Sequence, residues 1–234
     1  FAGGLDIPVV MGSRSTYTRA NLGGLEGRAL RAGDCLPVGE TSPFLAAPMR
    51  LPAFLIPDYA DQITLRVILG PQDELFAPEG IAALLNNEYR VSEEADRMGY
   101  RLEGPEIRHK DKADIVSDAL GAGAIQVPGS GQPIVMMADC GTTGGYAKIA
   151  AVIGADLWKL AQAKPQDSVR FVRCTDAEAV AALAAERECY REAAQWIQTG
   201  GKRSGEGVGR RMQLKIQGQE YQIEIEEVKA DENH

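Results

Sequence analysis

An aspartate followed by a glycine-rich stretch is the part of this sequence most suited to chemistry. In MMADCGTTGGYAKIA, residues 136–150, apolar residues give way to polar ones at Asp139 and then return. The apolar run before Asp139 predicts a strand, so the carboxylate is expected where that strand leaves the core. Glycine allows positive φ and close approach, so the backbone N–H groups of residues 141–145 could converge on an anion or a developing oxyanion.

We assign Asp139, Thr142 and Thr143 as the candidate catalytic residues. Asp139 could orient a substrate amide or take up a proton, while the threonine hydroxyls and glycine amides could hold the oxyanion. A strand-to-strand loop in which these side chains bond only to nearby backbone is the competing interpretation, and it stays open. Residues assigned to substrate binding in the same stretch are Gly144, Gly145 and Tyr146.

Two arginines and two glutamines extend the candidate site. Arg97 and Arg101 flank a Met-Gly-Tyr turn and could bind a carboxylate or carbamate in bidentate fashion. Many acids surround them, so at least one is expected in a surface ion pair. Because opposite faces of an extended segment cannot point into one pocket, the two should differ in role. Gln126 and Gln132 lie beside Pro and Gly and could present amide groups to a small polar ligand.

Composition excludes several classes of function. The net charge of −8 argues against a nucleic-acid binder, because phosphate affinity requires clustered Lys and Arg. Only two histidines occur, His109 and His234, so no metal site is predicted. The four cysteines form no CxxC pair and no apolar run reaches membrane-spanning length, which favours a cytoplasmic protein away from membranes.

Hydrophobic periodicity predicts a mainly β fold with a few helices. Strands are expected at ITLRVILG, EYRVS, YRLEG, AIQVP, PIVMMAD, YAKIAAVIG and SVRFVRC, and helices at about residues 75–85 and at ADLWKLAQA. AIQVP and PIVMMAD are separated by a short Gly-Ser-Gly turn and should pair as a hairpin. That pairing leads us to expect one concave pocket bordered by Asp139, Thr142, Thr143, Tyr146 and Gln126.

The two ends of the chain differ from its middle. Thr175 and Glu178 form a capping box that starts a long alanine-rich helix ending at Gly200. Beyond a flexible linker, apolar and polar residues alternate on both sides of Gly218 and predict a hairpin. Residues 3–39 show loops and short strands, with a turn at RAGD where Gly33 can take positive φ. Phe1 opens at an apparent strand end and is expected beside a sheet with an unpaired or externally paired neighbour.

Six ordered motifs resemble one known family. AGGLDIP, MGSRST, LGGLEGRALRAGD, DRMGYRLEG, IQVPGSGQPIVMMAD and TTGGYAKIA are similar to the family that comprises the 5-oxoprolinase C subunit, KipA and allophanate hydrolase subunit 2. The same module forms part of the carboxyltransferase domain of urea carboxylase. The resemblance implies cyclophilin-like β-barrel subdomains and an α-helical C-terminal segment.

The resemblance also implies a division of the chain. Residues 1–60 would be the C-terminal part of a first β subdomain and a connector, with the N-terminal part of that subdomain missing. Residues 61–199 would be the cyclophilin-like domain of a carboxyltransferase or of the 5-oxoprolinase C subunit, with its terminal helix. Residues 200–209 would be a linker, and the tail 210–234 resembles the start of a biotin carrier domain. No Met-Lys-Met follows, so the resemblance implies no covalent biotin on this chain.

Three functions are compatible with this family. The first is a subunit that works with the 5-oxoprolinase subunits A and B, the latter KipI-like, to open the lactam of 5-oxoproline, with ATP used through a partner. The second is a carboxyltransferase component that takes carboxybiotin from a partner, such as a biotin carrier protein, to urea or a similar small amide. The third is a non-enzymatic KipA-type regulator that binds a kinase-inhibitor partner. The first two must stabilise an oxyanion at an amide carbonyl.

Overall fold

The computed structural model describes residues 3–40, 51–57, 59 and 62–199, and the backbone of residues 210–216 and 219–225. The chain divides into two compact units, one of residues 1–50 with 200–234 and the other of residues 51–199. The predicted position of Phe1 and the predicted linker at 200–209 lie outside the described residues. The second unit contains the barrel, the helices and the candidate site.

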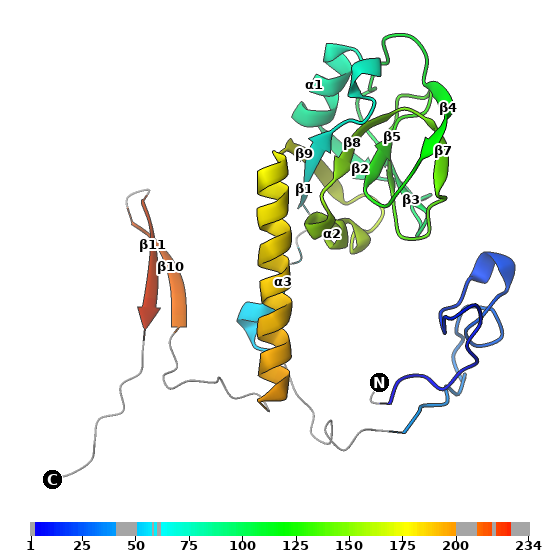
Figure 1. The fold of residues 1–234 in the computed structure, drawn as a ribbon, viewed down its shortest axis with the longest axis vertical. Coiled ribbons are helices and arrows are strands. Elements are labelled where there is room, and N and C mark those ends of the chain that lie inside the picture. Colours follow the sequence, from blue (N-terminus) through cyan, green and yellow to red (C-terminus); the bar gives the residue numbers. More distant parts are fainter. Residues whose placement is uncertain are drawn as a thin grey trace. The chain divides into compact units, whose positions relative to one another are not determined.

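Within residues 62–199, seven strands close into a barrel in the order β1-β8-β5-β6-β3-β2-β9 (Figure 1). Neighbouring strands are antiparallel except β1 and β9, which are parallel. The strands are β1 Gln62–Leu69, β2 Glu88–Val91, β3 Gly99–Glu103, β5 Ala124–Gln126, β6 Ile134–Met136, β8 Lys148–Val152 and β9 Ser168–Arg173. The predicted fold, mainly β with a few helices, is confirmed.

The core is filled by apolar side chains of the barrel strands, and in β1 alternate residues point into it. In β1, Ile63, Leu65 and Val67 are buried while the residues between them are more exposed, which is the period of two expected for a strand with one buried face. The ring of Tyr89 on β2 lies 6.0 Å from that of Phe171 on β9. These apolar contacts close the barrel without requiring any ligand.

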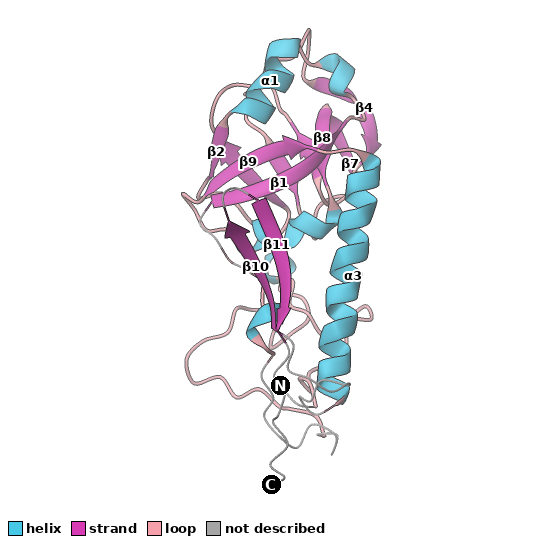
Figure 2. Cartoon of the chain, turned by 90° about the vertical axis from the view of Figure 1, so that its left-hand side faces the viewer, coloured by secondary structure: helices cyan, strands magenta, loops and turns pink. Residues whose placement is uncertain are grey.

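The helices lie outside the barrel (Figure 2). α1, Pro78–Asn86, starts with a proline at its first turn, where the missing N–H group costs nothing. α2 is the short helix Leu157–Ala161. α3, Asp176–Gln198, starts at the predicted capping box, in which Glu178 N–H donates to the Thr175 hydroxyl and Thr175 N–H donates to the Glu178 carboxylate. None of the helices in the described residues is long and apolar enough to cross a bilayer.

A two-stranded ribbon outside the barrel was not predicted from the sequence. It consists of β4, Asp114–Ala119, and β7, Thr143–Tyr146, which pair antiparallel with a bulge in β4. Figure 1 shows the two strands side by side at the rim of the barrel. From the sequence we expect a glycine-rich turn at residues 141–145, and that expectation is wrong for Gly144 and Gly145, because both belong to β7 and Gly144 is opposite Asp118 of β4.

The remaining described segments are simpler. Residues 3–40 form loops with isolated bridges such as Leu5 to Val38, and Gly33 has φ +92° in the predicted turn. Arg28 donates twice to the Asp34 carboxylate and thereby holds the pKa of Asp34 well below its ordinary value. β10, Arg210–Ile216, and β11, Gln219–Ile225, form the predicted hairpin.

A buried carboxylate ties α2 to the barrel. Asp156 is fully buried. Its carboxylate accepts hydrogen bonds of 2.8 to 2.9 Å from the backbone N–H and the guanidinium of Arg66 on β1. It also forms an ion pair of 2.8 Å with Lys159 on α2. Burial alone would raise the pKa of Asp156, but the hydrogen bonds from Arg66 and Lys159 outweigh it and lower the pKa to about 2. The folded state therefore prefers the ionised form.

We predict that Asp156 makes stability depend on pH in acid. Its pKa falls from 3.8 to about 2 on folding, so its contribution is present above pH 3.8 and is lost as the pH falls toward 2, by about 2 kcal/mol in all. Urea unfolding of the wild type and Asp156→Asn should show a stability gap that narrows between pH 4 and pH 2. A gap that stays constant over this range would contradict the assignment.

Candidate functional site

Asp139 lies where the pairing of β6 with β3 runs out. Its backbone N–H donates to the Arg97 carbonyl at 2.9 Å, which continues the pairing beyond the last residues of the two strands. Its two carboxylate oxygens accept from Arg97 at 2.7 and 3.0 Å. These bonds from Arg97 lower the pKa of Asp139. Asp139 is thus held as an anion, and both of its oxygens accept hydrogen bonds. In this state it can orient a hydrogen-bond donor of a ligand but is poorly suited to accepting a proton.

The two arginines have different partners, as expected from the sequence. Arg97 pairs with Asp139 and is 78% exposed. Arg101, two residues into β3, pairs with Glu94 at 3.2 Å. The expectation that at least one arginine pairs with a nearby acid is confirmed by Arg101 and Glu94, while Arg97 pairs with Asp139 instead.

A groove of about 610 Å³ lies beside β3 and the β5–β6 hairpin. Three residues assigned to substrate binding line it, namely Arg101, Gln132 and Tyr146. The other lining residues are Ser92, Glu93, Glu94, Leu102, Glu103, Pro128, Ser130, Pro133, Ile134 and Gln166. Three glutamates and one arginine give the groove an acidic rim over an apolar floor.

Asp139, Thr142, Thr143 and Gln126 are not among the residues that line this groove, so the single pocket expected from the sequence stays a prediction. The predicted hairpin does form, with Gln126 opposite Ile134 at the start of β6. Asp139 lies five residues beyond Ile134, past the end of β6 and in a turn.

Gln132 acts within the fold. Its amide nitrogen donates to the Gly104 carbonyl at 3.0 Å, and its amide oxygen accepts from Gly104 N–H at 2.9 Å. The side chain thereby replaces a backbone partner at the end of β3. These bonds leave its amide less able to bind a ligand than the sequence pattern indicates.

The glycine-rich stretch does not form the expected nest of amides. Gly141, Gly144 and Gly145 all lack positive φ, whereas a nest requires alternating handedness of the backbone. Gly144 has a different role. A Cβ there would lie 2.3 Å from the amide nitrogen of Gln126, so glycine makes room for that side chain. Gln126 is buried, and its amide nitrogen lies 3.4 Å from the Tyr146 carbonyl.

Lys148 is a functional candidate that we did not predict from the sequence. Its side chain is 3% exposed, and its ammonium donates to Asp118 Oδ2 at 2.9 Å. Asp118 lies on β4 of the ribbon and its side chain is 49% exposed. Hydrogen bonds, first from Lys148 and then from Ala119 N–H and Gln72, lower the pKa of Asp118. A lysine buried this completely is uncommon, and such lysines are almost always paired with an anion.

Gln72 completes this cluster. Its backbone N–H donates to the Lys148 carbonyl at 3.1 Å, and its side-chain oxygen accepts from Lys148 N–H at 3.1 Å. Its amide nitrogen donates to Asp118 Oδ2 at 3.0 Å. Gln126 is aligned with Lys148 across β5 and β8 and lies under Gly144. The glycine-rich strand β7 therefore lies beside a buried cation, with Gly144 opposite Asp118.

The sequence contains a pattern that indicates the burial of Lys148. In KIAAV the lysine is two residues from Ala150 and four from Val152, both of which are buried with their strand neighbours in the barrel core. A charge in phase with the buried residues of a strand is unusual. Its partner Asp118 could not be found in the same way, because nothing in DIVSDA identifies the strand that would cover the end of the barrel.

Comparison with known proteins identifies a family model and curated relatives that match most of this chain. A family model described as the carboxyltransferase domain, subdomain A and B, matches residues 1–173. The chain is 37% identical over 195 residues to the 5-oxoprolinase C subunit of Escherichia coli (strain K12), covering 83% of this chain and 61% of that protein. It is 34% identical over 188 residues to urea amidolyase of Saccharomyces cerevisiae, covering 73% of this chain and 10% of that protein.

A solved structure shares the fold. The crystal structure of the Kluyveromyces lactis urea carboxylase matches with a TM-score of 0.68 and 28% identity, covering 84% of this chain and 18% of that one. Against the 5-oxoprolinase C subunits of Escherichia coli and Haemophilus influenzae, the chain spans 61% and 59% of their lengths. The comparison therefore concerns about three fifths of such a protein.

We predict that the charge of Lys148 does not stabilise the fold. In Lys148→Met a buried cation is replaced by an apolar chain of similar shape, and Asp118 can be hydrated because it is half exposed, so stability should be unchanged or higher. Lys148→Ala leaves a void and should cost about 2 kcal/mol or more. Urea unfolding of both variants checks this. Equal destabilisation in the two would mean that the charge itself supports the fold.

Proposed function

The chain belongs to the carboxyltransferase domain family, and on this basis we propose that it forms part of the C subunit of an ATP-dependent 5-oxoprolinase. In this proposal it works with the partner subunits A and B in the cytoplasm to open 5-oxoproline to glutamate. The observation that carries the proposal is 37% identity to the 5-oxoprolinase C subunit of Escherichia coli over 83% of the chain. The buried Lys148 supports it, because its ammonium is a hydrogen-bond donor held in a largely dry environment.

Opening a lactam places demands on the site that Lys148 can meet. Water adds to the ring carbonyl, the C–N bond breaks, and the ring nitrogen takes a proton. Negative charge develops on the carbonyl oxygen in the first step, and a preorganised donor in a dry environment stabilises it strongly. In our proposal the Lys148 ammonium is this donor, with the Gln126 amide beside it as a second polar group.

The residues first assigned from the sequence keep a place in the proposal. Thr142 and Thr143 lead into β7, and Thr143 is opposite Ala119, next to Asp118. Their hydroxyls would donate to substrate oxygens at this rim. Asp139, held as an anion by Arg97, would orient a substrate amide N–H rather than take its proton. Gly145 and Tyr146 continue the same strand toward Lys148.

ATP is assigned to a partner subunit. The sequence contains no GxxxxGK[ST] pattern for holding its phosphates, so this chain would contribute lactam binding and charge stabilisation. ATP, when bound on the partner, supplies the free energy for hydrolysis of the amide bond.

Carboxyl transfer to a small amide such as urea is the second candidate. The identity to urea amidolyase and the structural match to urea carboxylase favour it. Here a partner, such as a biotin carrier protein, would bring biotin that carries the carboxyl group. Lys148 would bind the oxygen of the group being transferred. The 234 residues contain no Met-Lys-Met motif, so we assign the biotin to the partner.

We predict that Lys148→Met abolishes turnover in the reconstituted complex. Loss of one oxyanion donor costs on the order of a hundredfold or more in rate. The chain and its A and B partners should be mixed and ATP hydrolysis followed with 5-oxoproline, with Lys112→Met as the control for loss of an exposed lysine charge. Turnover of the wild type that requires urea, bicarbonate and biotin, and that avidin blocks, would replace the first candidate by the second.

A further prediction concerns the glycine-rich strand. Thr143→Val keeps the shape of a β-branched residue but removes the hydroxyl, so it should fold normally and lose most turnover, on the order of a hundredfold. Thr64→Val on β1, also an exposed strand threonine, is the matched control. Wild-type turnover in Thr143→Val combined with Asp139→Asn would assign both residues to the fold alone.

A further inference from the structure

Two barrel donors meet at one carboxylate oxygen in the Lys148 cluster. The Lys148 ammonium lies 2.9 Å and the Gln72 amide nitrogen 3.0 Å from the same atom, Asp118 Oδ2. A cation and an amide donor aimed at one oxygen form a site for a carboxylate or another oxyanion. In this structure that oxygen belongs to the chain itself.

The donors are held in place by the barrel and not by Asp118. Lys148 is on β8, and its side chain is almost fully buried. Gln72 is fixed by two hydrogen bonds to the backbone of Lys148, one from its N–H and one to its side-chain oxygen. Removal of Asp118 would therefore leave both donors close to their present positions.

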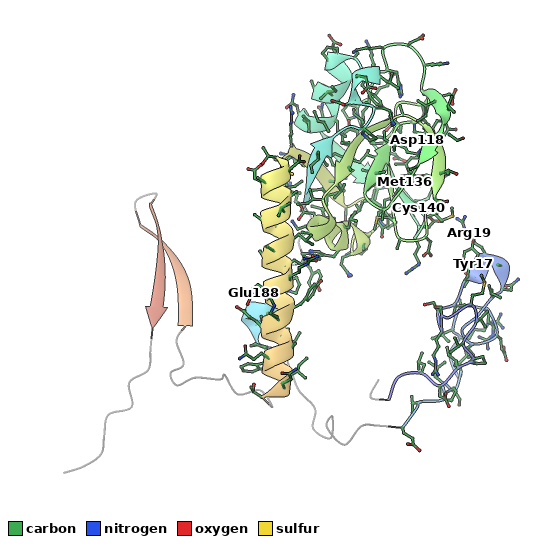
Figure 3. The ribbon with its side chains drawn as sticks, viewed as in Figure 1. Tyr17, Arg19, Asp118, Met136, Cys140 and Glu188 are labelled. Carbon is green, nitrogen blue, oxygen red and sulfur yellow. The ribbon has the colours of Figure 1, made fainter. Side chains whose placement is uncertain are left out.

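The acceptor, in contrast, is on a part of the fold that can move away. β4 and β7 form a sheet of two strands outside the barrel, and Asp118 is labelled on it in Figure 3. A two-stranded ribbon is of marginal stability alone, and Gly144 and Gly145 weaken β7 further. Of the residues of β4, Ile115 alone packs against the apolar core, and Val116 beside it is 92% exposed, so the apolar anchor of the strand is small.

We propose that Lys148 and Gln72 form a binding site for a small carboxylate-type anion, and that Asp118 fills this site in the free chain as a displaceable competitor. An incoming carboxylate makes the same two hydrogen bonds that Asp118 gives up, so the exchange leaves no buried donor unpaired. The half-exposed Asp118 side chain is the route by which the ligand reaches the otherwise buried ammonium. Binding then frees β4 from the barrel.

The inference deepens the proposed function and rests on it for the identity of the natural ligand. The proposed function places at Lys148 the oxyanion that develops on the lactam carbonyl, and the carboxyl-transfer alternative places there the carboxyl group being moved. Both present the same oxygen chemistry to Lys148 and Gln72. Acetate, which takes part in neither reaction, tests the site without either function.

We predict that loss of the Asp118 carboxylate strengthens anion binding. If the ion pair is closed in about nine molecules of ten, removing the competitor should tighten binding about tenfold. Binding of acetate, 5-oxoproline and bicarbonate to the full chain should be measured by calorimetry for the wild type, Asp118→Ala and Asp118→Asn. Asp114→Ala removes another exposed carboxylate of β4 and is the matched control.

The expected result is tighter binding in both Asp118 variants, wild-type binding in Asp114→Ala, and no binding when Lys148→Met is added to Asp118→Ala. In the wild type, hydrogen exchange of residues 114–119 should quicken on saturation with ligand. Equal affinity in Asp118→Ala and Asp114→Ala, or binding that survives Lys148→Met, would overturn the inference. Acetate binding with the predicted pattern, in a complex without 5-oxoproline-dependent ATP hydrolysis, would refute the proposed function alone. 5-Oxoproline but not bicarbonate binding would assign the site to the lactam reaction.

Discussion

The ion pair between Lys148 and Asp118 connects the closed barrel to the β4–β7 ribbon at its rim. A barrel of this kind is complete without the ribbon, because its seven strands pair in a ring and its core is apolar. The ribbon has a sequence rich in exposed residues and few ways to hold its position. The ion pair of Lys148 supplies one, and it holds Asp118, which lies opposite Gly144 of β7.

Burying the Lys148 ammonium costs free energy of desolvation, and this cost explains why an anionic partner lies beside it. Desolvation penalises the charged form of a lysine unless hydrogen bonds and an anion compensate. The compensation here comes from Asp118, and that aspartate is half exposed and belongs to a separate sheet. Among the described residues, Asp156, the other buried charge, has two partly exposed cationic partners, Arg66 and Lys159, whereas Lys148 has one anionic partner, on the ribbon outside the barrel. We regard Lys148 as functional because its one charged partner lies on a sheet separate from the barrel.

Regular elements could be predicted well from the sequence and the site less well. Strands with clear alternation, such as β1, and the helix after the Thr175 capping box were found because local patterns determine them. β4 and β7 were missed because DIVSDA is polar and TTGGY reads as a turn, and only pairing with each other makes them strands. Of the site residues, Arg97 and Asp139 were each assigned from the sequence, and the structure shows that they are bonded to each other. Lys148, Gln72 and Asp118 come from three separate segments, and no local pattern indicates that the fold brings them together.

The state of the Lys148 ammonium is the most direct test of its functional role. Nitrogen-15 NMR of lysine side chains in the full chain should show one ammonium signal, absent in Lys148→Met, with hydrogen exchange slowed by burial and by its bond to Asp118. Saturating acetate is expected to shift this signal while keeping it protected, because one carboxylate replaces another. A signal that exchanges as fast as those of exposed lysines, or that acetate leaves unchanged in both the wild type and Asp118→Ala, would contradict the role of Lys148 as an anion donor.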